Sequence, residues 1–215
     1  MKTILLSQRL TNVEAYDETR ECLDIRWASF LKECGLIPVA VPINGNVVDY
    51  FSAFNPVGIL LTGGNDLSCC CPGDDLCKKR DSFERGLVKE AIDRDLSLLG
   101  VCRGMQLIAH YFSLSMKRVE GHVTESHPIS IQVNSRFGRF YEKHCVVNSY
   151  HNFSISDIKD AFDISARMAE DNVIEAFEHG EYDIAGMMWH PERVEPFDKR
   201  DISFFKEFFS NGPPN

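Results

Sequence analysis

An apolar run at residues 96–101, LSLLGV, ends at a cysteine that stands between two glycines, in Gly100-Val101-Cys102-Arg103-Gly104. Apolar residues resume at helical spacing immediately behind it, in residues 104–112. The pattern predicts a buried strand that turns sharply into a helix and holds the cysteine at the turn. A thiol in that place is either packing filler or a nucleophile.

Strand-like and helix-like segments alternate through the first half of the chain. Apolar runs are expected to form strands at 3–6, 37–41, 57–62 and 96–101, and amphipathic stretches to form helices at 18–34, 46–54, 80–94 and 104–112. Continuous apolar strands that alternate with helices are typical of a parallel sheet covered on both faces. The expected fold class is therefore α/β, with a flavodoxin-like, mostly parallel sheet flanked by helices.

The second half has a different pattern. Short β-like runs follow one another with little helix between them until 200–209; they lie at 129–133, 144–147, 162–168, 173–177 and 184–188. We expect them to add antiparallel strands to the parallel sheet. No linker or internal repeat divides the chain, so one domain over residues 1–215 is predicted.

Charge and hydropathy narrow the classes of partner. The formal net charge of −9 disfavours binding to nucleic acid, because such a chain repels phosphate backbones. No apolar stretch approaches the length of a membrane span, and the apolar part of MKTILLSQRL is too short for a signal peptide. With eight cysteines expected to be mostly reduced thiols, the predicted location is the cytoplasm.

A nucleophilic cysteine needs a base, and the base needs a group that orients it. Among seven histidines, His190 follows the apolar run 184–189 and begins His190-Pro191-Glu192. Strand ends at the carboxyl edge of a parallel sheet meet, so His190 can reach Cys102, and Glu192 can fix the imidazole tautomer. A surface loop histidine beside a proline is the alternative for His190 taken alone.

Two backbone N–H groups are candidates for an oxyanion hole. The N–H of Arg103 opens the helix behind Cys102, whose positive end also favours a thiolate. The turn Gly63-Gly64 follows the strand at 57–62 and can aim a second N–H group at the same sheet edge.

Several motifs in this order resemble one known family. They are Gly63-Gly64-Asn65-Asp66, Arg80-Asp81 with Glu84, Cys102-Arg103-Gly104-Met105-Gln106, Asn148-Ser149-Tyr150-His151, Ile174-Glu175-Ala176 and His190-Pro191-Glu192. Together they resemble the class I glutamine amidotransferase-like family with a Cys-His-Glu triad, in particular its free-standing γ-glutamyl hydrolases. Two departures, Tyr111-Phe112-Ser113 and Asn152-Phe153, concern the leaving-group side of the pocket.

The resemblance implies a role for each motif. Cys102 would attack the γ-carbonyl of a γ-glutamyl amide, His190 held by Glu192 would move protons, and glutamate would leave through a γ-glutamyl thioester. The N–H groups of Gly64 and Arg103 would hold the oxyanion. The residues expected to bind the substrate are Gly63, Asn65, Gln106, Asn148, Ser149, Tyr150 and His151. No cofactor and no metal are expected, and the partner is a small-molecule γ-glutamyl substrate.

The sequence does not decide which amine is the leaving group, or whether the chain works alone or with a partner chain. A branch that resembles γ-glutamyl-CDP-amidate hydrolases, linked to a phosphoramidate sugar modification and so to capsule biosynthesis, would suit Ser7-Gln8-Arg9, the expected helix from Arg20 to Trp27 and the loop at 64–67. The alternative is a glutaminase subunit that delivers ammonia to a separate synthase chain. A non-catalytic binding protein and a homodimer are further alternatives; an intact triad disfavours the former.

Three other sets of residues are interpreted as structural rather than functional. Three adjacent thiols at 69–71 fit one tetrahedral ion poorly, so we expect a mobile loop over the cleft rather than a zinc site. His122 and His127 are predicted at a polar rim, with contact to the leaving group as the alternative. Arg80 is predicted to pair along its helix with Glu84, with contact to an anionic substrate as the alternative.

Overall fold

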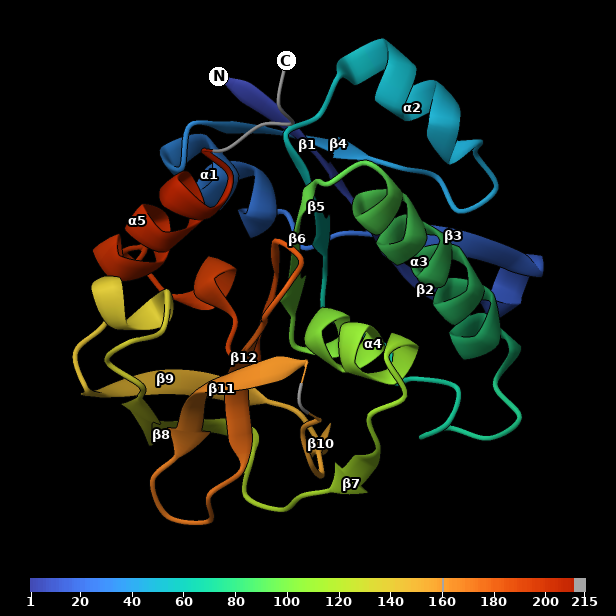
Figure 1. Cartoon of the computed structure of the whole chain (residues 1–215). Coiled ribbons are helices and arrows are strands. Elements are labelled where there is room, and N and C mark those ends of the chain that lie inside the picture. The colour runs from blue at the N-terminus through green and yellow to red at the C-terminus, as the bar shows by residue number, and fades with distance from the viewer. Residues whose placement is uncertain (160, 211–215) are drawn as a thin grey trace.

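The computed structural model describes residues 1–159 and 161–210, apart from the side chains of residues 124 and 125. Its main sheet has nine strands (Figure 1). In spatial order they are β4 (Leu36–Ala40), β1 (Lys2–Leu6), β5 (Gly58–Leu61), β6 (Ser97–Val101), β13 (Ile184–Met187), β12 (Ile174–His179), β11 (Phe162–Met168), β8 (Val123–Ile131) and β9 (His144–Tyr150).

The first five of these strands are parallel, and the remaining four continue the sheet in antiparallel pairs. Taken in chain order, the parallel strands lie in the flavodoxin-like order 2-1-3-4-5. The predicted fold class is confirmed. Because β5, β6 and β13 are neighbours, the segments that follow them emerge together at one edge of the sheet.

Helices cover both faces of the parallel half (Figure 1). α1 (Arg26–Glu33) and α5 (Lys199–Phe208) lie on one face, and α2 (Val47–Phe54), α3 (Asp75–Asp93) and α4 (Arg103–Tyr111) lie on the other. Alternation along β1 shows why: Ile4 and Leu6 pack with the α1–α5 layer, and Leu5 packs with the other layer. The central strands β5, β6 and β13 are therefore buried on both faces, as their continuous apolar runs predict, whereas the edge strand β4 is only partly buried.

The predicted helix at 18–34 is wrong in its first part. Glu18–Cys22 forms β3, which pairs with β2 (Arg9–Val13) in a separate two-stranded sheet, and α1 begins only at Arg26. Helical spacing of buried residues starts at Trp27, whereas Glu18–Cys22 has no fully buried residue to give it a helical face. The hairpin places Arg9 opposite Cys22.

Two further differences concern strand direction and helix length. The run at 184–188, grouped above with the antiparallel additions, forms β13 and pairs in parallel with β6. α3 begins at Asp75 rather than at 80, because the Asp74 carboxylate accepts the N–H groups of Leu76 and Cys77 and caps an earlier start.

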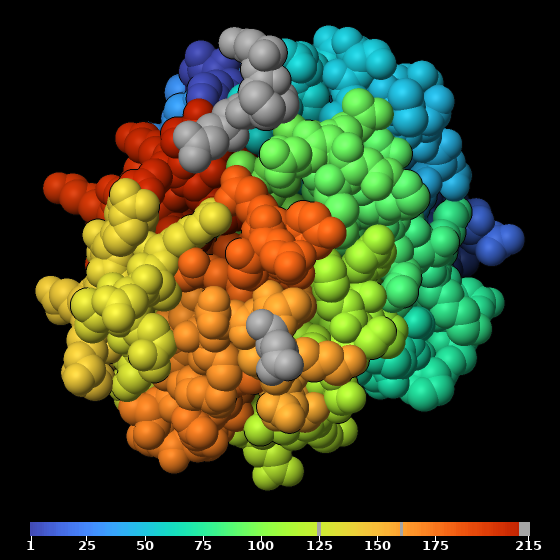
Figure 2. All heavy atoms as spheres, viewed as in Figure 1, coloured from blue at the N-terminus to red at the C-terminus, as the bar shows by residue number. Residues whose placement is uncertain are grey.

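The smaller elements lie around the antiparallel half. They are β7 (Met116–Arg118), β10 (Phe153–Ile155) and three short 3₁₀ helices, η1 (Glu14–Tyr16), η2 (Phe137–Arg139) and η3 (Pro191–Arg193). In the space-filling view the green α3–α4 region and the yellow-to-orange antiparallel strands form one continuous surface (Figure 2). No helix among the described residues is long and apolar enough to cross a membrane.

Candidate active site

The turn between β6 and α4 holds Cys102 in a strained backbone conformation. Its φ of 52° and ψ of −107° are unfavourable for a residue with a side chain, and its N–H donates to the carbonyl oxygen of Met187 at 2.7 Å. A Cβ at Gly100 would lie 2.5 Å from the carbonyl carbon of Gly104, and a Cβ at Gly104 would lie 2.1 Å from the carbonyl oxygen of Leu61. Both glycines are therefore required by close contact of α4 with the strands, and the turn has the predicted elbow form.

His190 lies next to Cys102 across the Gly63 turn. A Cβ built at Gly63 would be 2.6 Å from His190 Cε1, 3.4 Å from His190 Nε2 and 3.6 Å from Cys102 Cβ. On the other side of the ring, His190 Nδ1 lies 2.7 Å from Glu192 Oε1, and both side chains are buried. Cys102, His190 and Glu192 are thus brought together in the order that nucleophilic catalysis uses.

The charge state of His190 depends on both neighbours. Burial lowers the pKa of the imidazole, but its attraction to Cys102 and its hydrogen bonds with Cys102 and Glu192 outweigh burial and raise this pKa to about 9. The ring is therefore an imidazolium at neutral pH when the thiol is ionised.

Asn148 holds the backbone of His190 rather than facing the cavity. Its Nδ2 donates to the carbonyl oxygen of His190 at 2.8 Å, and its Oδ1 accepts the N–H of His190 at 2.7 Å. Because β9 carries Asn148 and His190 follows β13, this pair joins the antiparallel half of the sheet to the strand end at the site.

Arg80 holds the glycine turn that faces Cys102. Its Nη2 donates to the carbonyl oxygen of Thr62 at 2.8 Å, and its Nη1 donates to the carbonyl oxygens of Gly63, at 3.1 Å, and Gly64. The side chain is fully buried and also pairs with Glu84, at 2.8 Å from Nε to Oε1. The predicted helical pair exists, but the contacts to the turn carbonyls depend on the tertiary structure.

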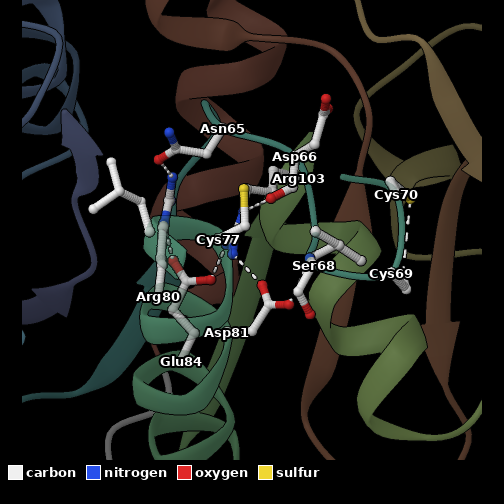
Figure 3. A network of polar contacts seen from close by, with 12 residues as sticks. Asn65, Asp66, Ser68, Cys69, Cys70, Cys77, Arg80, Asp81, Glu84 and Arg103 are labelled. Carbon is white, nitrogen blue, oxygen red and sulfur yellow. Dashed lines mark hydrogen bonds and ion pairs between the residues drawn. The ribbon is translucent and has the colours of Figure 1, made fainter. Parts of the chain in front are cut away.

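Arg103 completes this buried network (Figure 3). Its guanidinium pairs with both Asp81 and Glu84, and Asp81 also accepts the N–H of Ser68 at 2.8 Å. Burial raises the pKa of Glu84, but the two arginines outweigh it and leave this pKa below its usual value. Two arginines thus face two carboxylates, and the network fixes α3, α4 and the glycine turn as one unit.

Two cavities meet at the strand ends and share Gly64, His190 and Arg193. The Cys102 cavity is lined by Gly64, Asn65, Asp66, Cys102, Arg103, Gln106, Tyr150, His151, Asn152, His190 and Arg193. The Arg9 cavity is lined by Arg9, Cys22, Leu23, Asp24, Trp27, Thr62, Gly63, Gly64, His190, Glu192 and Arg193. The hairpin β2–β3, which the sequence did not predict, thus supplies a wall of the second cavity.

The residues predicted to bind substrate divide between the cavity wall and its support. Tyr150 is 39% exposed, with its ring centroid 5.6 Å from that of His190 and the Arg193 guanidinium 4.6 Å from its own. Gln106 lines the Cys102 cavity while its Nε2 donates to the carbonyl oxygen of Phe153 at 2.7 Å.

Asn65 lines the Cys102 cavity and also holds β2, whereas Ser149 only holds another segment in place. The Asn65 amide bonds both backbone groups of Leu10, each at 3.0 Å, which attaches the glycine turn to β2. Ser149 is fully buried and donates to the carbonyl oxygen of His122 at 2.8 Å, so neither Ser149 nor Asn148 lines the Cys102 cavity.

One structural interpretation made from the sequence needs correction. His122 and His127 do not lie at a polar rim: their side chains are 0% and 4% exposed and face Glu175 on β12. The thiols at 69–71 lie in a turn before α3, where Cys71 Sγ is 2.6 Å from Cys77 Sγ.

Comparisons with known proteins identify the family. The family model of peptidase C26 matches residues 4–192. The chain is 34% identical, over 95% of its length and 96% of the relative's, to γ-glutamyl-CDP-amidate hydrolase of Campylobacter jejuni. It is 30% identical to the candidate glutamine amidotransferase-like protein YvdE of Lactococcus lactis, over 84% of each chain.

Among solved structures, a candidate GMP synthase component from Thermoplasma acidophilum superposes with a TM-score of 0.73. The match covers 98% of this chain and 94% of that one at 21% identity, which supports the fold. The chain therefore belongs to the peptidase C26 family, within the class I glutamine amidotransferase-like proteins, and is an amidohydrolase.

Proposed function

We propose that the protein hydrolyses the γ-glutamyl amide bond of a small-molecule conjugate and releases glutamate, with Cys102 as the nucleophile. The observation that carries the proposal is the placement of Cys102 and His190 together beside Gly63, with Glu192 bonded to the far ring nitrogen. The relative in Campylobacter jejuni, whose name gives a γ-glutamyl amide as its substrate, supports it.

The reaction begins when the Cys102 thiolate attacks the γ-carbonyl carbon of the substrate. The N–H groups of Gly64 and Arg103 stabilise the resulting oxyanion. His190, as an imidazolium, gives a proton to the leaving nitrogen while the C–N bond breaks. The products of this half are the free amine and a γ-glutamyl thioester on Cys102.

Water completes the cycle. Neutral His190 takes a proton from water, whose oxygen attacks the thioester carbonyl, and the C–S bond then breaks to return the thiolate and release glutamate. Glu192 keeps the His190 ring oriented in both halves.

The two cavities indicate where each part of the substrate binds. The Cys102 cavity takes the glutamyl group, and the Arg9 cavity takes the leaving group. Arg9 forms no ion pair among the described residues, and Arg193, whose Nε lies 3.4 Å from Glu192 Oε1, lines the same cavity. Two such guanidinium groups suit a phosphate-bearing leaving group, because arginine binds phosphate in a bidentate manner. A γ-glutamyl nucleoside diphosphate amidate is thus the first substrate to test.

The test is glutamate release from a panel of conjugates, by the wild type and by Cys102→Ala. The panel contains glutamine, a γ-glutamyl amine, a γ-glutamyl peptide and γ-glutamyl-CDP-amidate. We expect turnover of the amidate and a loss of about 10⁴-fold or more in kcat for Cys102→Ala. Cys145→Ala, which removes another buried thiol outside both cavities, is the matched control.

Hydroxylamine provides a separate readout of the intermediate, because it should intercept the thioester as γ-glutamyl hydroxamate. Full turnover by Cys102→Ala would overturn the assignment of the nucleophile. Silence on every conjugate, with slow hydrolysis of glutamine, would favour a glutaminase subunit that needs a synthase chain.

A further inference from the structure

Glu175 on β12 is surrounded by three buried histidines. The side chains of His122, His151 and Glu175 are 0%, 1% and 0% exposed, and that of His127 is 4% exposed. Six polar atoms in this cluster are buried without a hydrogen bond: His122 Nδ1, both ring nitrogens of His127, His151 Nε2 and both carboxylate oxygens of Glu175. Such atoms are costly unless something binds them, and one cluster with six of them calls for a ligand.

The distances within the cluster fit a metal ion. From Glu175 Oε1 it is 3.4 Å to His122 Nδ1, 3.4 Å to His127 Nε2 and 3.5 Å to His151 Nε2. Those separations are long for hydrogen bonds. They agree with the edge of a tetrahedron around Zn²⁺, about 3.3 to 3.5 Å for metal–ligand bonds of about 2.0 to 2.1 Å. The ligand atoms of His122, His151 and Glu175 also lie within 4.8 Å of one another.

We propose that His122, His151 and Glu175 form a binding site for a divalent transition metal, Zn²⁺ in the first place, with His127 beside them. Imidazole nitrogens with one carboxylate are a donor set that suits zinc, and three protein ligands leave one position of a tetrahedral ion for another donor. The sequence expectation of no metal is revised by this proposal.

The outer contacts of two ligands orient the nitrogens that the site needs. His122 Nε2 lies 2.8 Å from Asp171 Oδ2, which leaves Nδ1 facing Glu175. His151 Nδ1 lies 3.2 Å from the carbonyl oxygen of Phe153, which leaves Nε2 facing Glu175. A carboxylate or a carbonyl oxygen behind the ligating imidazole is the usual support of a metal-bound histidine.

A second group, Cys71, Asp74 and Cys77, is close enough to bind an ion but is a weaker candidate. The Asp74 carboxylate already accepts the N–H groups of Leu76 and Cys77 as the cap of α3, and it is exposed. In the histidine cluster the Glu175 carboxylate caps no helix, and its Oε1 lies 3.4 to 3.5 Å from a ring nitrogen of each histidine.

An ion at this site would brace the wall of the Cys102 cavity. His122 precedes β8, His127 lies within it, Glu175 lies on β12, and His151 is in the turn between β9 and β10. Tyr150, the last residue of β9, and the turn residues His151 and Asn152 line the Cys102 cavity. The metal would therefore fix the turn from behind, without contact with the reacting atoms, and the inference does not depend on the proposed function.

The test measures metal in tag-free protein, since a histidine tag would bind zinc itself. After chelation and dialysis, each protein is titrated with Zn²⁺ and with Co²⁺ and its metal content is measured by mass spectrometry. We expect about one ion per chain in the wild type, with a visible Co²⁺ band and no thiolate charge-transfer band. Glu175→Gln and His122→Ala should lose about tenfold or more of the affinity.

Two control variants separate this site from others. His144→Ala removes an exposed histidine of β9 outside the cluster, and the double variant Cys71→Ser, Cys77→Ser removes the competing group. Both should keep the ion. The melting temperature of the wild type should rise with Zn²⁺, because an ion that binds only the folded state stabilises it.

If the variants of the metal ligands do not fold, metal titration of the wild-type protein still tests the proposal. Absence of binding, a Co²⁺ spectrum with thiolate charge transfer, or loss of the ion in the cysteine double variant would each overturn the proposal. An unchanged affinity in folded Glu175→Gln would overturn it as well.

Discussion

Asn148 bonds both backbone groups of His190, donating to its carbonyl oxygen at 2.8 Å and accepting its N–H at 2.7 Å. The resemblance placed Asn148 in the substrate pocket, but the amide instead holds the segment that carries the candidate base. The position of His190 relative to Cys102 therefore depends on β9 as well as on β13.

Replacement of Asn148 by alanine removes both of these hydrogen bonds. We expect kcat for glutamate release to fall about 10- to 100-fold, because small displacements of a catalytic group are costly, while KM changes little. Ser126→Ala, which alters the residue opposite Asn148 on β8, is the control and should behave as the wild type. A folded Asn148→Ala protein with normal kcat would contradict the positioning role.

The pKa of His190 predicts an alkaline limit to activity. This pKa is raised from 6.5 to about 9 by Cys102 and Glu192, so the imidazolium is present below pH 9 and is lost above it. We expect kcat/KM to fall above about pH 9, since the leaving nitrogen then lacks its proton donor. In Glu192→Gln the carboxylate that stabilises the imidazolium is gone, so the alkaline limb should move to lower pH. The measurement is kcat/KM from pH 6 to 10.5 for both proteins. An alkaline limb at the same pH in both would contradict the contribution of Glu192 to the pKa of His190.

Arg80 is predicted to position the glycine turn for catalysis. Arg80→Lys keeps a charge beside Glu84 but cannot reach the carbonyls of residues 62–64 in the same geometry. We expect kcat to fall about tenfold or more, while alkylation of Cys102 by iodoacetamide, which needs no oxyanion hole, keeps its rate. Lys79→Ala changes the exposed neighbour on the same helix and serves as the control. Equal losses of turnover and alkylation would indicate general damage to the fold instead.

Arg9 should discriminate between leaving groups. If its guanidinium binds a phosphate, Arg9→Ala should raise KM for γ-glutamyl-CDP-amidate about 10- to 100-fold, the equivalent of one charge-assisted hydrogen bond. Hydrolysis of a γ-glutamyl amine without phosphate should not change. Arg20→Ala, on the exposed strand β3, is the matched control. A parallel loss on both substrates would remove the phosphate assignment.

The buried carboxyl of Asp201, outside the candidate active site, should make the stability of the fold depend on pH. The carboxyl is buried beside Tyr141 and Trp189, and burial raises its pKa from 3.8 to about 6. Between pH 4 and 6 the unfolded chain loses this proton while the folded protein keeps it, so stability falls as pH rises through that range. Above pH 6 the ionised carboxylate lowers the free energy of unfolding by about 3 kcal/mol, which is the equivalent of this pKa shift.

Asp201→Asn keeps an acceptor for Tyr141 and Trp189 but has no carboxyl to ionise. We expect it to be more stable than the wild type at pH 8 and equal at pH 4, as measured by urea unfolding. Asp163→Asn, an exposed change on β11, should show no such difference. An advantage that is the same at both pH values would contradict the assignment.

The parallel half of the fold and the elbow followed from local sequence patterns. Continuous apolar runs predicted β1, β5 and β6 because strands buried on both faces need apolar residues throughout. Gly100 and Gly104 around Cys102 predicted the sharp turn because a Cβ at either position would collide with backbone. The apolar runs and the glycine spacing are short patterns along the chain, so they can be recognised in a single sequence, although the backbone that a Cβ at Gly104 would meet belongs to Leu61 of β5.

Partnerships between distant residues were decided only by the tertiary structure. The hairpin β2–β3 has no apolar alternation strong enough to reveal it, yet it brings Arg9 to the candidate leaving-group cavity. The cluster around Glu175 needs the register of β8 against β9 and the turn after β9 to bring three histidines to one carboxylate. The type and spacing of residues along the chain do not show which distant side chains come into contact. The pairing of strands that are far apart in the sequence decides that.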